Sequence, residues 1–277
     1  MIVPGPYGDG MDSKEFVEAV ELAQEFFGYE ADACVERLNG PMIFKQEMDA
    51  HGLDWTYDKG EGAIWDLLTV RATVSSGTPE RFREELLDRL LKEYPLKDYP
   101  LGGKYVMSLL DYGCGIGREA LIALRNGFAT IGVDRGKTLQ FATFYVNKFM
   151  QMDDEDIWFP YDAENYVDVE PGLDVIQCFE YLEHDPDPVK RIENFWDMLK
   201  PGGYLICNAR SFNAHDTGHL EENFHYQFNF EEIIGTKGFK CLYFPWNPPN
   251  IYNIAVWQKV GKDEGEYHGA TTESGEW

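Results

Sequence analysis

The distribution of hydrophobic positions divides the chain into a mostly helical N-terminal part and a later part in which strands alternate with helices. Before about residue 99, apolar residues recur three to four positions apart, which indicates amphipathic helices. Phe16, Val17, Val20, Ala23, Phe26 and Phe27 form one such stripe. From residue 106 onward, short apolar runs bounded by glycine, proline and acidic residues indicate buried strands. This order predicts an α/β protein with an N-terminal helical extension.

Five apolar runs in the later part have the length of buried strands. They lie near 106–111, 129–134, 157–162, 173–179 and 204–208. Two further runs, at 241–244 and 251–257, predict a closing antiparallel pair, and 228–236 predicts the helix before it. The later part therefore predicts a sheet of seven strands.

A glycine-rich turn joins the first apolar run to a helix that opens at Arg118. Asp111 comes first, and glycine then occupies alternate positions: Gly113, Gly115 and Gly117. Glycine lets the backbone turn sharply and approach a ligand with no Cβ in the way. The following helix N-terminus supplies free N–H groups and a partial positive charge. Such a turn can hold a small ligand that carries a carboxylate, a ribose and a base.

The spacing of the glycines disfavours a dinucleotide cofactor. The dinucleotide fingerprint Gly-x-Gly-x-x-Gly needs glycine three positions after Gly115, where this chain has Arg118. The third glycine instead comes two positions on, at Gly117, and the chain contains no complete P-loop Gly-x-x-x-x-Gly-Lys-Ser/Thr. An oxidoreductase with a nucleotide cofactor is therefore the less favoured alternative.

The pattern Asp111-x-Gly-x-Gly-x-Gly117 resembles the first motif of class I S-adenosylmethionine (SAM)-dependent methyltransferases. Further matches follow in the order of that family, including an acid at Asp134 that ends the second strand and the turn Leu-Lys-Pro-Gly-Gly before the fifth. The resemblance covers residues 104 to 259. It implies a Rossmann-like, seven-stranded, mostly parallel sheet and SAM as the cofactor.

The resemblance also implies which residues contact the cofactor. An acid in the position of Asp134 accepts hydrogen bonds from ribose hydroxyls, and Asp162 ends the strand beside which the family binds the adenine amino group. The expected cofactor residues are Asp111, Gly113, Cys114, Gly115, Gly117, Asp134, Arg135, Asp162, Ala163 and Phe179.

Candidate catalytic residues follow the fourth strand. The methyl group of a sulfonium is already electrophilic, so the protein has to orient the reactants and manage a proton. Glu180, Glu183 and His184 would share one face if the chain turns helically after the strand. Two carboxylates and an imidazole are competent ligands for Mg²⁺ or Mn²⁺. The Glu-x-x-Glu-His pattern resembles the metal motif of quinone-biosynthesis O-methyltransferases and small-RNA 3′-end 2′-O-methyltransferases.

An insertion at 209–227 follows the fifth strand and contains His215, His219 and His225. In the small-RNA enzymes a further histidine from this region joins the metal site, and the sequence does not choose among the three. Leu-Glu-His before Pro-Asp-Pro is also common in metal-free members of the family. There, His184 or His219 could accept the proton, because imidazole titrates near neutral pH. The catalytic candidates are thus Glu180, His184 and His219, and the metal candidates are Glu180, Glu183 and His184.

Composition narrows the partners. The formal net charge of −25 opposes nucleic acids and anionic membranes and favours a neutral or cationic small-molecule substrate, although general solubility explains it equally well. The five cysteines have no repeated spacing, and Cys178 and Cys207 fall in predicted strands. This pattern predicts reduced core thiols in a cytoplasmic protein. No apolar run is long enough to span a bilayer, and the N-terminus does not read as a signal peptide.

The resulting prediction has three regions. Residues 1–99 form a helical cap or substrate lid, 100–260 form the SAM-binding methyltransferase domain, and 261–277 form a disordered tail. The expected function is methyl transfer to an oxygen or nitrogen of a small molecule, with or without a metal ion. A non-catalytic scaffold with a methyltransferase-like fold is the main alternative. The intact glycines, Asp134 and Asp162 argue against it, since a scaffold has no chemical need for them. The oligomeric state is not predicted.

Overall fold

The computed structural model describes residues 20–22, 24–26, 28, 107–150, 157–166, 172–208, 212, 219–243 and 254–260. Its strands are β1 (Met107–Tyr112), β2 (Phe128–Asp134), β3 (Trp158–Asp162), β4 (Leu173–Cys178), β5 (Leu199–Asn208), β6 (Phe239–Tyr243) and β7 (Ile254–Lys259). Its helices are α6 (Arg118–Arg125), α7 (Gly136–Met150), α8 (Pro188–Met198) and α9 (Phe230–Thr236), with 3₁₀ turns η3 (Leu182–His184) and η4 (Glu221–Tyr226).

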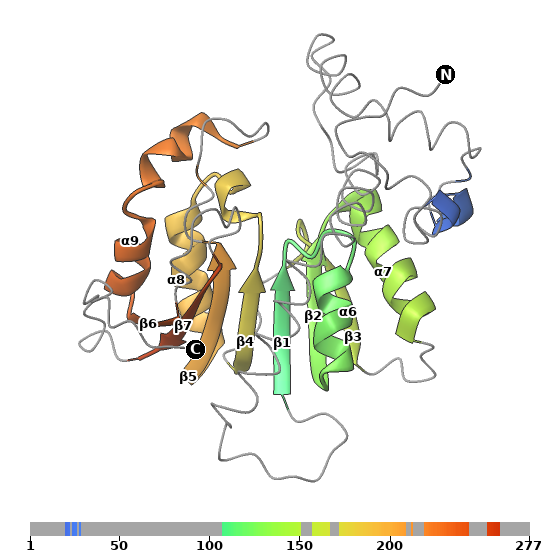
Figure 1. The fold of residues 1–277 in the computed structure, drawn as a ribbon, viewed down its shortest axis with the longest axis horizontal. Helices are drawn as coiled ribbons and strands as arrows, with labels where there is room; N and C mark the ends of the chain where they lie inside the picture. Colours follow the sequence, from blue (N-terminus) through green and yellow to red (C-terminus); the bar gives the residue numbers. More distant parts are fainter. Residues whose placement is uncertain are drawn as a thin grey trace, which may run out of the picture. The chain divides into compact units, whose positions relative to one another are not determined.

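The seven strands form one sheet in the order β3-β2-β1-β4-β5-β7-β6 (Figure 1). β2 pairs with β3, β1 with β4 and β4 with β5 in parallel. β7 runs antiparallel to both β5 and β6. The predicted Rossmann-like, mostly parallel sheet with a closing antiparallel pair is therefore confirmed.

The chain divides into two compact units. The first contains the described residues before 107 and those from Cys114 to Tyr166, and the second contains Met107–Gly113 and the described residues from 172 onward.

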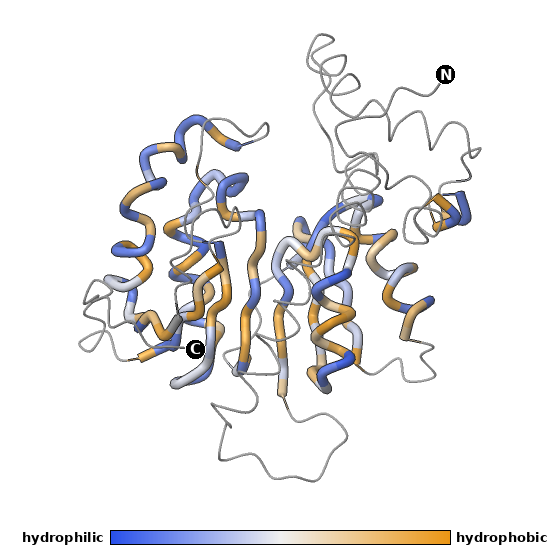
Figure 2. The backbone as a smooth tube through the Cα atoms, viewed as in Figure 1, coloured by the Kyte–Doolittle hydropathy of each residue, from blue (hydrophilic) through white to orange (hydrophobic). Residues whose placement is uncertain are grey.

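In the first unit, α6 and α7 pack against β2 and β3. The parallel register of these strands pairs Thr130 with Trp158 and, at the other end, Asp134 with Asp162. Two predicted cofactor acids therefore end neighbouring strands side by side. In Figure 2, α6 is hydrophilic at its two ends and hydrophobic between them, where the five residues Ala120–Leu124 are all buried.

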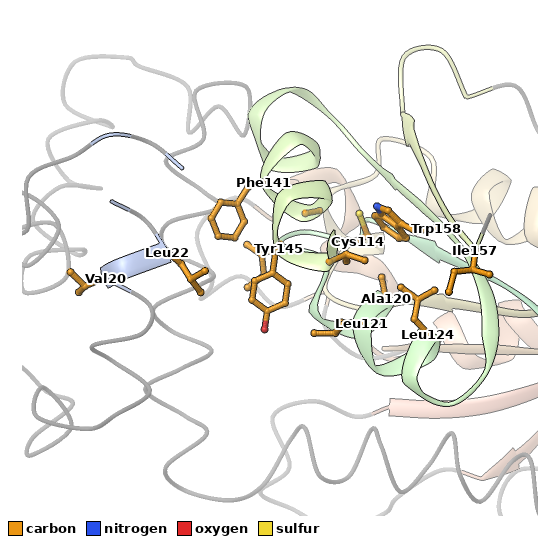
Figure 3. Packing of buried hydrophobic residues seen from close by; sticks show 13 residues of the cluster. Val20, Leu22, Cys114, Ala120, Leu121, Leu124, Phe141, Tyr145, Ile157 and Trp158 are labelled. Atoms are coloured by element: carbon orange, nitrogen blue, oxygen red, sulfur yellow. The ribbon is translucent and has the colours of Figure 1, made fainter. Parts of the chain in front are cut away.

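Side chains from α6, α7 and the N-terminal helical residues form the core of this unit (Figure 3). The predicted stripe is confirmed where it is described: Val20 is buried, and Phe26 meets Phe141 edge to face at 5.1 Å between ring centroids. Leu22, which lies off the predicted stripe, is also buried, with 1 % of its surface exposed. The remaining predicted N-terminal helices lie outside the described residues.

In the second unit, β4 is buried along its whole length between β1 and β5. The carboxylate of Asp174, the acidic residue of this strand, accepts two hydrogen bonds. The backbone N–H of Ser108 donates to it at 2.9 Å, and Lys200 Nζ donates to it at 2.8 Å. The predicted core thiols Cys178 and Cys207 are both buried and free. They are paired neighbours on β4 and β5.

Helix α8 is secured at both ends. The Asp187 carboxylate caps its N-terminus by accepting from the Lys190 N–H at 2.9 Å, and Pro188 follows as the first helical residue. Near its C-terminus, Lys259 Nζ from β7 donates to the carbonyls of Trp196 and Leu199 at 2.5 and 2.6 Å.

The structure leaves the predicted domain boundaries untested and bears on the prediction about membrane-spanning segments only for the described residues. The domain boundaries predicted at 99/100 and 260/261 stay predictions, because residues 99, 100 and 261 lie outside the described part, as does the predicted tail. Within the described residues, no helix combines the length and the apolar character that crossing a membrane requires.

Candidate active site

In the first unit, the glycine turn is tied to the end of β2 by Asp134. The N–H of Gly115 donates to Asp134 Oδ2 at 2.8 Å, and the N–H of Arg135 donates to Oδ1 at 2.8 Å. Beside them, the Cys114 N–H donates to the Val133 carbonyl at 3.0 Å. The carboxylate therefore braces the turn, and each oxygen keeps a lone pair that a ligand hydroxyl could use.

The environment of Asp134 disfavours its charged form. Burial raises the pKa of this carboxyl to about 6, while the N–H groups of Arg135 and Gly115 act in the opposite direction and Asp162 adds to the rise. The Asp134 carboxyl therefore changes its protonation state near pH 6, well above the ordinary range of an aspartate.

The other predicted cofactor residues of the first unit lie around this acid. The N–H of Ala163 donates to the Asp134 carbonyl at 2.8 Å, and the Asp162 side chain accepts from the N–H of Glu164 at 3.0 Å. Gly117 has a φ of +79°, and a Cβ there would lie 3.1 Å from the backbone of Ala142 on α7. This glycine is therefore required by helix packing within the protein itself.

In the second unit, Gly113 ends β1 in a left-handed conformation, with a φ of +74°. A Cβ at this position would lie 2.6 Å from Cδ2 of Tyr181, so the tyrosine ring rests directly on the glycine backbone. The same ring meets Tyr112 edge to face at 5.0 Å. Asp111 is buried and pairs in register with Gln177 on β4.

The segment that follows β4 is also held by charge. Arg191 on α8 donates from Nε to Asp185 Oδ2 at 2.8 Å, and its guanidinium lies 4.5 Å from the centre of the Tyr112 ring. Tyr181 and Asp185 thus anchor the two ends of the turn η3, which contains Glu183 and His184. Phe179, another predicted cofactor residue, is half-buried just before this turn.

Glu180 adopts a conformation that the sequence did not predict. It has a φ of +49°, the left-handed region that non-glycine residues rarely occupy. Asn208 at the end of β5 holds it there: Glu180 N–H donates to Asn208 Oδ1 at 3.3 Å, and Asn208 Nδ2 donates to the Glu180 carboxylate. Helical turning begins only at Leu182, so the condition under which Glu180 would share a face with Glu183 and His184 is not met.

Glu183, His184 and His219 come together in the second unit. One ligand atom from each lies within 4.8 Å of the others. His219 Nε2 is 3.8 Å from Glu183 Oε1, and the two imidazole rings meet edge to face at 5.0 Å between centroids. The side chains of Glu183 and His219 are only 1 % and 6 % exposed. We call these three residues the Glu–His–His cluster; Glu180 lies outside it.

The structure separates the three histidines of the insertion. His219 belongs to the cluster. His225 is exposed, and its ring centroid lies 3.8 Å from that of Tyr226. His215 lies outside the described residues. Sequence reasoning missed Tyr181, Asn208 and Asn223, which hold the segment after β4 in place. Nothing in the local sequence distinguishes these residues from other aromatic or amide side chains.

A family model described as a methyltransferase domain matches residues 80–236, more than half of the chain. This chain belongs to that family. The predicted class I SAM-dependent methyltransferase is confirmed at the level of family and fold.

Curated relatives match this chain over a shorter stretch. The ubiquinone biosynthesis O-methyltransferase of Alkalilimnicola ehrlichii is 34% identical over 115 residues, covering 41% of this chain and 45% of that protein. The protein of the same name from Thiobacillus denitrificans is 34% identical over 117 residues, covering 42% and 48%. The match thus spans about half the length of these relatives.

A solved structure of a candidate O-methyltransferase from Nostoc punctiforme shares the fold. Its TM-score is 0.51 at 13% identity, and the alignment covers 72% of the present chain and 60% of that chain.

Proposed function

We propose that this methyltransferase transfers the methyl group of SAM to a hydroxyl oxygen of a small molecule, with the Glu–His–His cluster managing the hydroxyl proton. The cluster is the observation that carries the choice of oxygen. A hydroxyl has to lose its proton to become a good nucleophile, and two imidazoles beside a carboxylate are suited to that task. The matched relatives are named O-methyltransferases, which supports the same choice.

For the cofactor, we propose the residues that the sequence suggested. Asp134 accepts from the ribose hydroxyls, and Asp162 and Ala163 line the adenine. The hydrogen bond from Gly115 to Asp134 supports this role, because it keeps the acid directed at the glycine turn. The full proposed group is Asp111, Gly113, Cys114, Gly115, Gly117, Asp134, Arg135, Asp162, Ala163 and Phe179.

The cluster also fits a divalent cation. Its ligand atoms are close enough to share one ion, and they consist of two imidazole nitrogens and a carboxylate oxygen. A bound cation would lower the pKa of an acceptor hydroxyl. Imidazole ligands favour transition metals, whereas Mg²⁺ prefers oxygen. We therefore propose Glu183, His184 and His219 as ligands and Mn²⁺ in preference to Mg²⁺, with Glu180 as a further candidate ligand.

The proton-handling role belongs to the same side chains. Glu183 lies beside His219 and can hold its imidazole in one orientation, while His184 is half-buried and available to an acceptor. Without a cation, either histidine can accept the proton directly. The formal charge of −25 favours a neutral or cationic acceptor over an anionic one.

The test is a calorimetric titration of Mn²⁺, and separately Mg²⁺, into metal-stripped protein saturated with S-adenosylhomocysteine (SAH). We expect SAH to bind, Mn²⁺ to bind more tightly than Mg²⁺, and Mn²⁺ binding to disappear in His219→Ala. His225→Ala is the matched control, because this exposed histidine of the same insertion should leave Mn²⁺ affinity unchanged. Formation of SAH from SAM is then followed with catechol and benzylamine as acceptors.

Two results would overturn the proposal. Failure of the protein to bind SAH would remove the cofactor assignment, and methylation of benzylamine but not catechol would remove the choice of oxygen. Methylation of catechol that depends on His219 but not on His225 would support it.

A further inference from the structure

Asn223 connects the histidine insertion to the turn after β4. Its side chain is buried in η4, with 2 % of the residue exposed. The amide Nδ2 donates to the Asp185 carbonyl at 2.8 Å and to the Glu183 carbonyl at 3.3 Å. These two carbonyls flank His184, so a single amide group holds the backbone on both sides of one cluster histidine.

Backbone hydrogen bonds of the same insertion place His219 next to Glu183. The N–H of Leu220 donates to the Glu183 carbonyl at 3.1 Å, and the N–H of Asn223 donates to the Leu220 carbonyl at 2.9 Å. The turn 220–223 is thereby closed on itself and attached to Glu183. His219 immediately precedes this turn, and its imidazole reaches the Glu183 carboxylate as a consequence.

The turn η3 does not need Asn223 for its own shape. The N–H of His184 donates to the Tyr181 carbonyl at 2.9 Å, and the Asp185 side chain is held by Arg191. The backbone N–H of Leu220 already joins the insertion to this turn, and Asn223 adds side-chain hydrogen bonds to the Glu183 and Asp185 carbonyls. Loss of the Asn223 amide would remove both side-chain hydrogen bonds and leave the insertion held less firmly, while the sheet would keep its contacts.

We propose that Asn223 is a positioning residue that brings His219 into the Glu–His–His cluster. The inference rests on the proposed function in so far as that cluster handles the proton or the cation. Asn223 itself touches backbone carbonyls and acts through His219 and His184. Residues that orient ligands in this indirect way typically change metal affinity by about 10- to 100-fold when they are replaced.

Asn223→Asp provides the sharpest test, because it keeps the shape of the side chain and replaces the donating NH₂ group with an acceptor oxygen. Asn223→Ala removes the group altogether. Asn126→Asp is the matched control, since the Asn126 amide also donates to a backbone carbonyl, that of Ile122 at the end of α6, outside the cluster.

Two readouts are made on metal-stripped protein with SAH bound. The first is Mn²⁺ affinity by calorimetry. The second is acylation by diethyl pyrocarbonate, mapped by mass spectrometry, in which the exposed His225 serves as the internal standard for the buried His219. Both Asn223 variants should lose at least about tenfold in Mn²⁺ affinity. They should also acylate His219 faster relative to His225, with unchanged SAH affinity.

The inference would be overturned if Asn223→Asp kept wild-type Mn²⁺ affinity and slow acylation of His219. Equal effects in Asn126→Asp would also overturn it, because they would assign the losses to general destabilisation.

The proposed function and the role of Asn223 can fail separately. If the wild-type protein binds no Mn²⁺, the metal-assisted function fails, whereas the acylation of His219 still tests whether Asn223 positions it.

Discussion

At the scale of single residues, the regularly spaced glycines of the turn serve different physical needs. Gly113 leaves room for the Tyr181 ring, and Gly117 leaves room for the backbone of Ala142. Gly115 instead presents its N–H to Asp134. The sequence suggested one common reason, close approach of a ligand, but two of these glycines are already required by contacts within the protein.

We expect Gly113→Ala to destabilise the protein by about 2–4 kcal/mol. A left-handed alanine costs roughly 1–2 kcal/mol, and displacing a packed ring adds a similar amount. Gly127→Ala is the control, because Gly127 also has a positive φ but a Cβ there would meet nothing within 4 Å. Urea unfolding midpoints measure both variants. Equal losses would show that the Tyr181 contact contributes nothing beyond backbone strain.

Asp134 should make cofactor binding depend on pH. Its pKa of about 6 in the folded protein means that the carboxyl is protonated below that pH and cannot accept charge-assisted hydrogen bonds from hydroxyls. We expect SAH affinity to be constant above about pH 7 and to fall below about pH 6, by at most about tenfold per pH unit for one proton. Calorimetry between pH 5 and 8 measures the profile.

Asp134→Asn is the control for this profile, with weaker SAH binding and no step near pH 6. Parallel profiles in the two proteins would assign the titration to another group.

The Asp134 carboxyl also affects stability. Its ordinary pKa is 3.8, so between pH 3.8 and about 6 the folded protein holds a proton that the unfolded chain has lost. Its contribution to unliganded stability therefore declines as the pH rises from about 4 to 6.

At the scale of elements, the connection between β4 and α8 shows how a short segment is shaped by its neighbours. From the sequence, Glu180, Glu183 and His184 would share one face if the chain turned helically directly after β4. Asn208 on β5 holds Glu180 in a left-handed conformation instead, and η3 starts two residues later. A partner 28 positions away decides this outcome, so the local pattern Glu-x-x-Glu-His could not reveal it.

The start of α8, in contrast, is encoded locally. Asp187 caps the helix through the Lys190 N–H, so we expect Asp187→Ala to lower the free energy of unfolding by about 0.5–2 kcal/mol. Asp187→Ser, which keeps a capping oxygen, should lose much less. Thermal unfolding compares the variants. If serine is as destabilising as alanine, the capping bond is not the source of the loss.

At the scale of the whole molecule, the net charge of −25 bears on which partners can bind, and the family match bears on the fold and the kind of reaction. The charge predicts that nucleic acids are not partners, because a strongly acidic surface repels phosphate backbones. The family follows from ordered motifs. The match to curated relatives covers about half their length, so the acceptor has to be sought through the site chemistry.

The sequence by itself determined the family, the order of the strands along the chain, and the acid and glycines of the proposed cofactor turn. These features depend on the spacing of hydrophobic residues and on motifs whose residues lie a few positions apart, and both can be read from the sequence without a structure. The tertiary structure decided which histidine joins Glu183 and His184, why Gly113 and Gly117 are glycine, and that Asn223 holds the insertion in place. Each of these depends on contacts between segments distant in the chain, where neighbouring backbone carbonyls and rings set the geometry and local composition carries no signal.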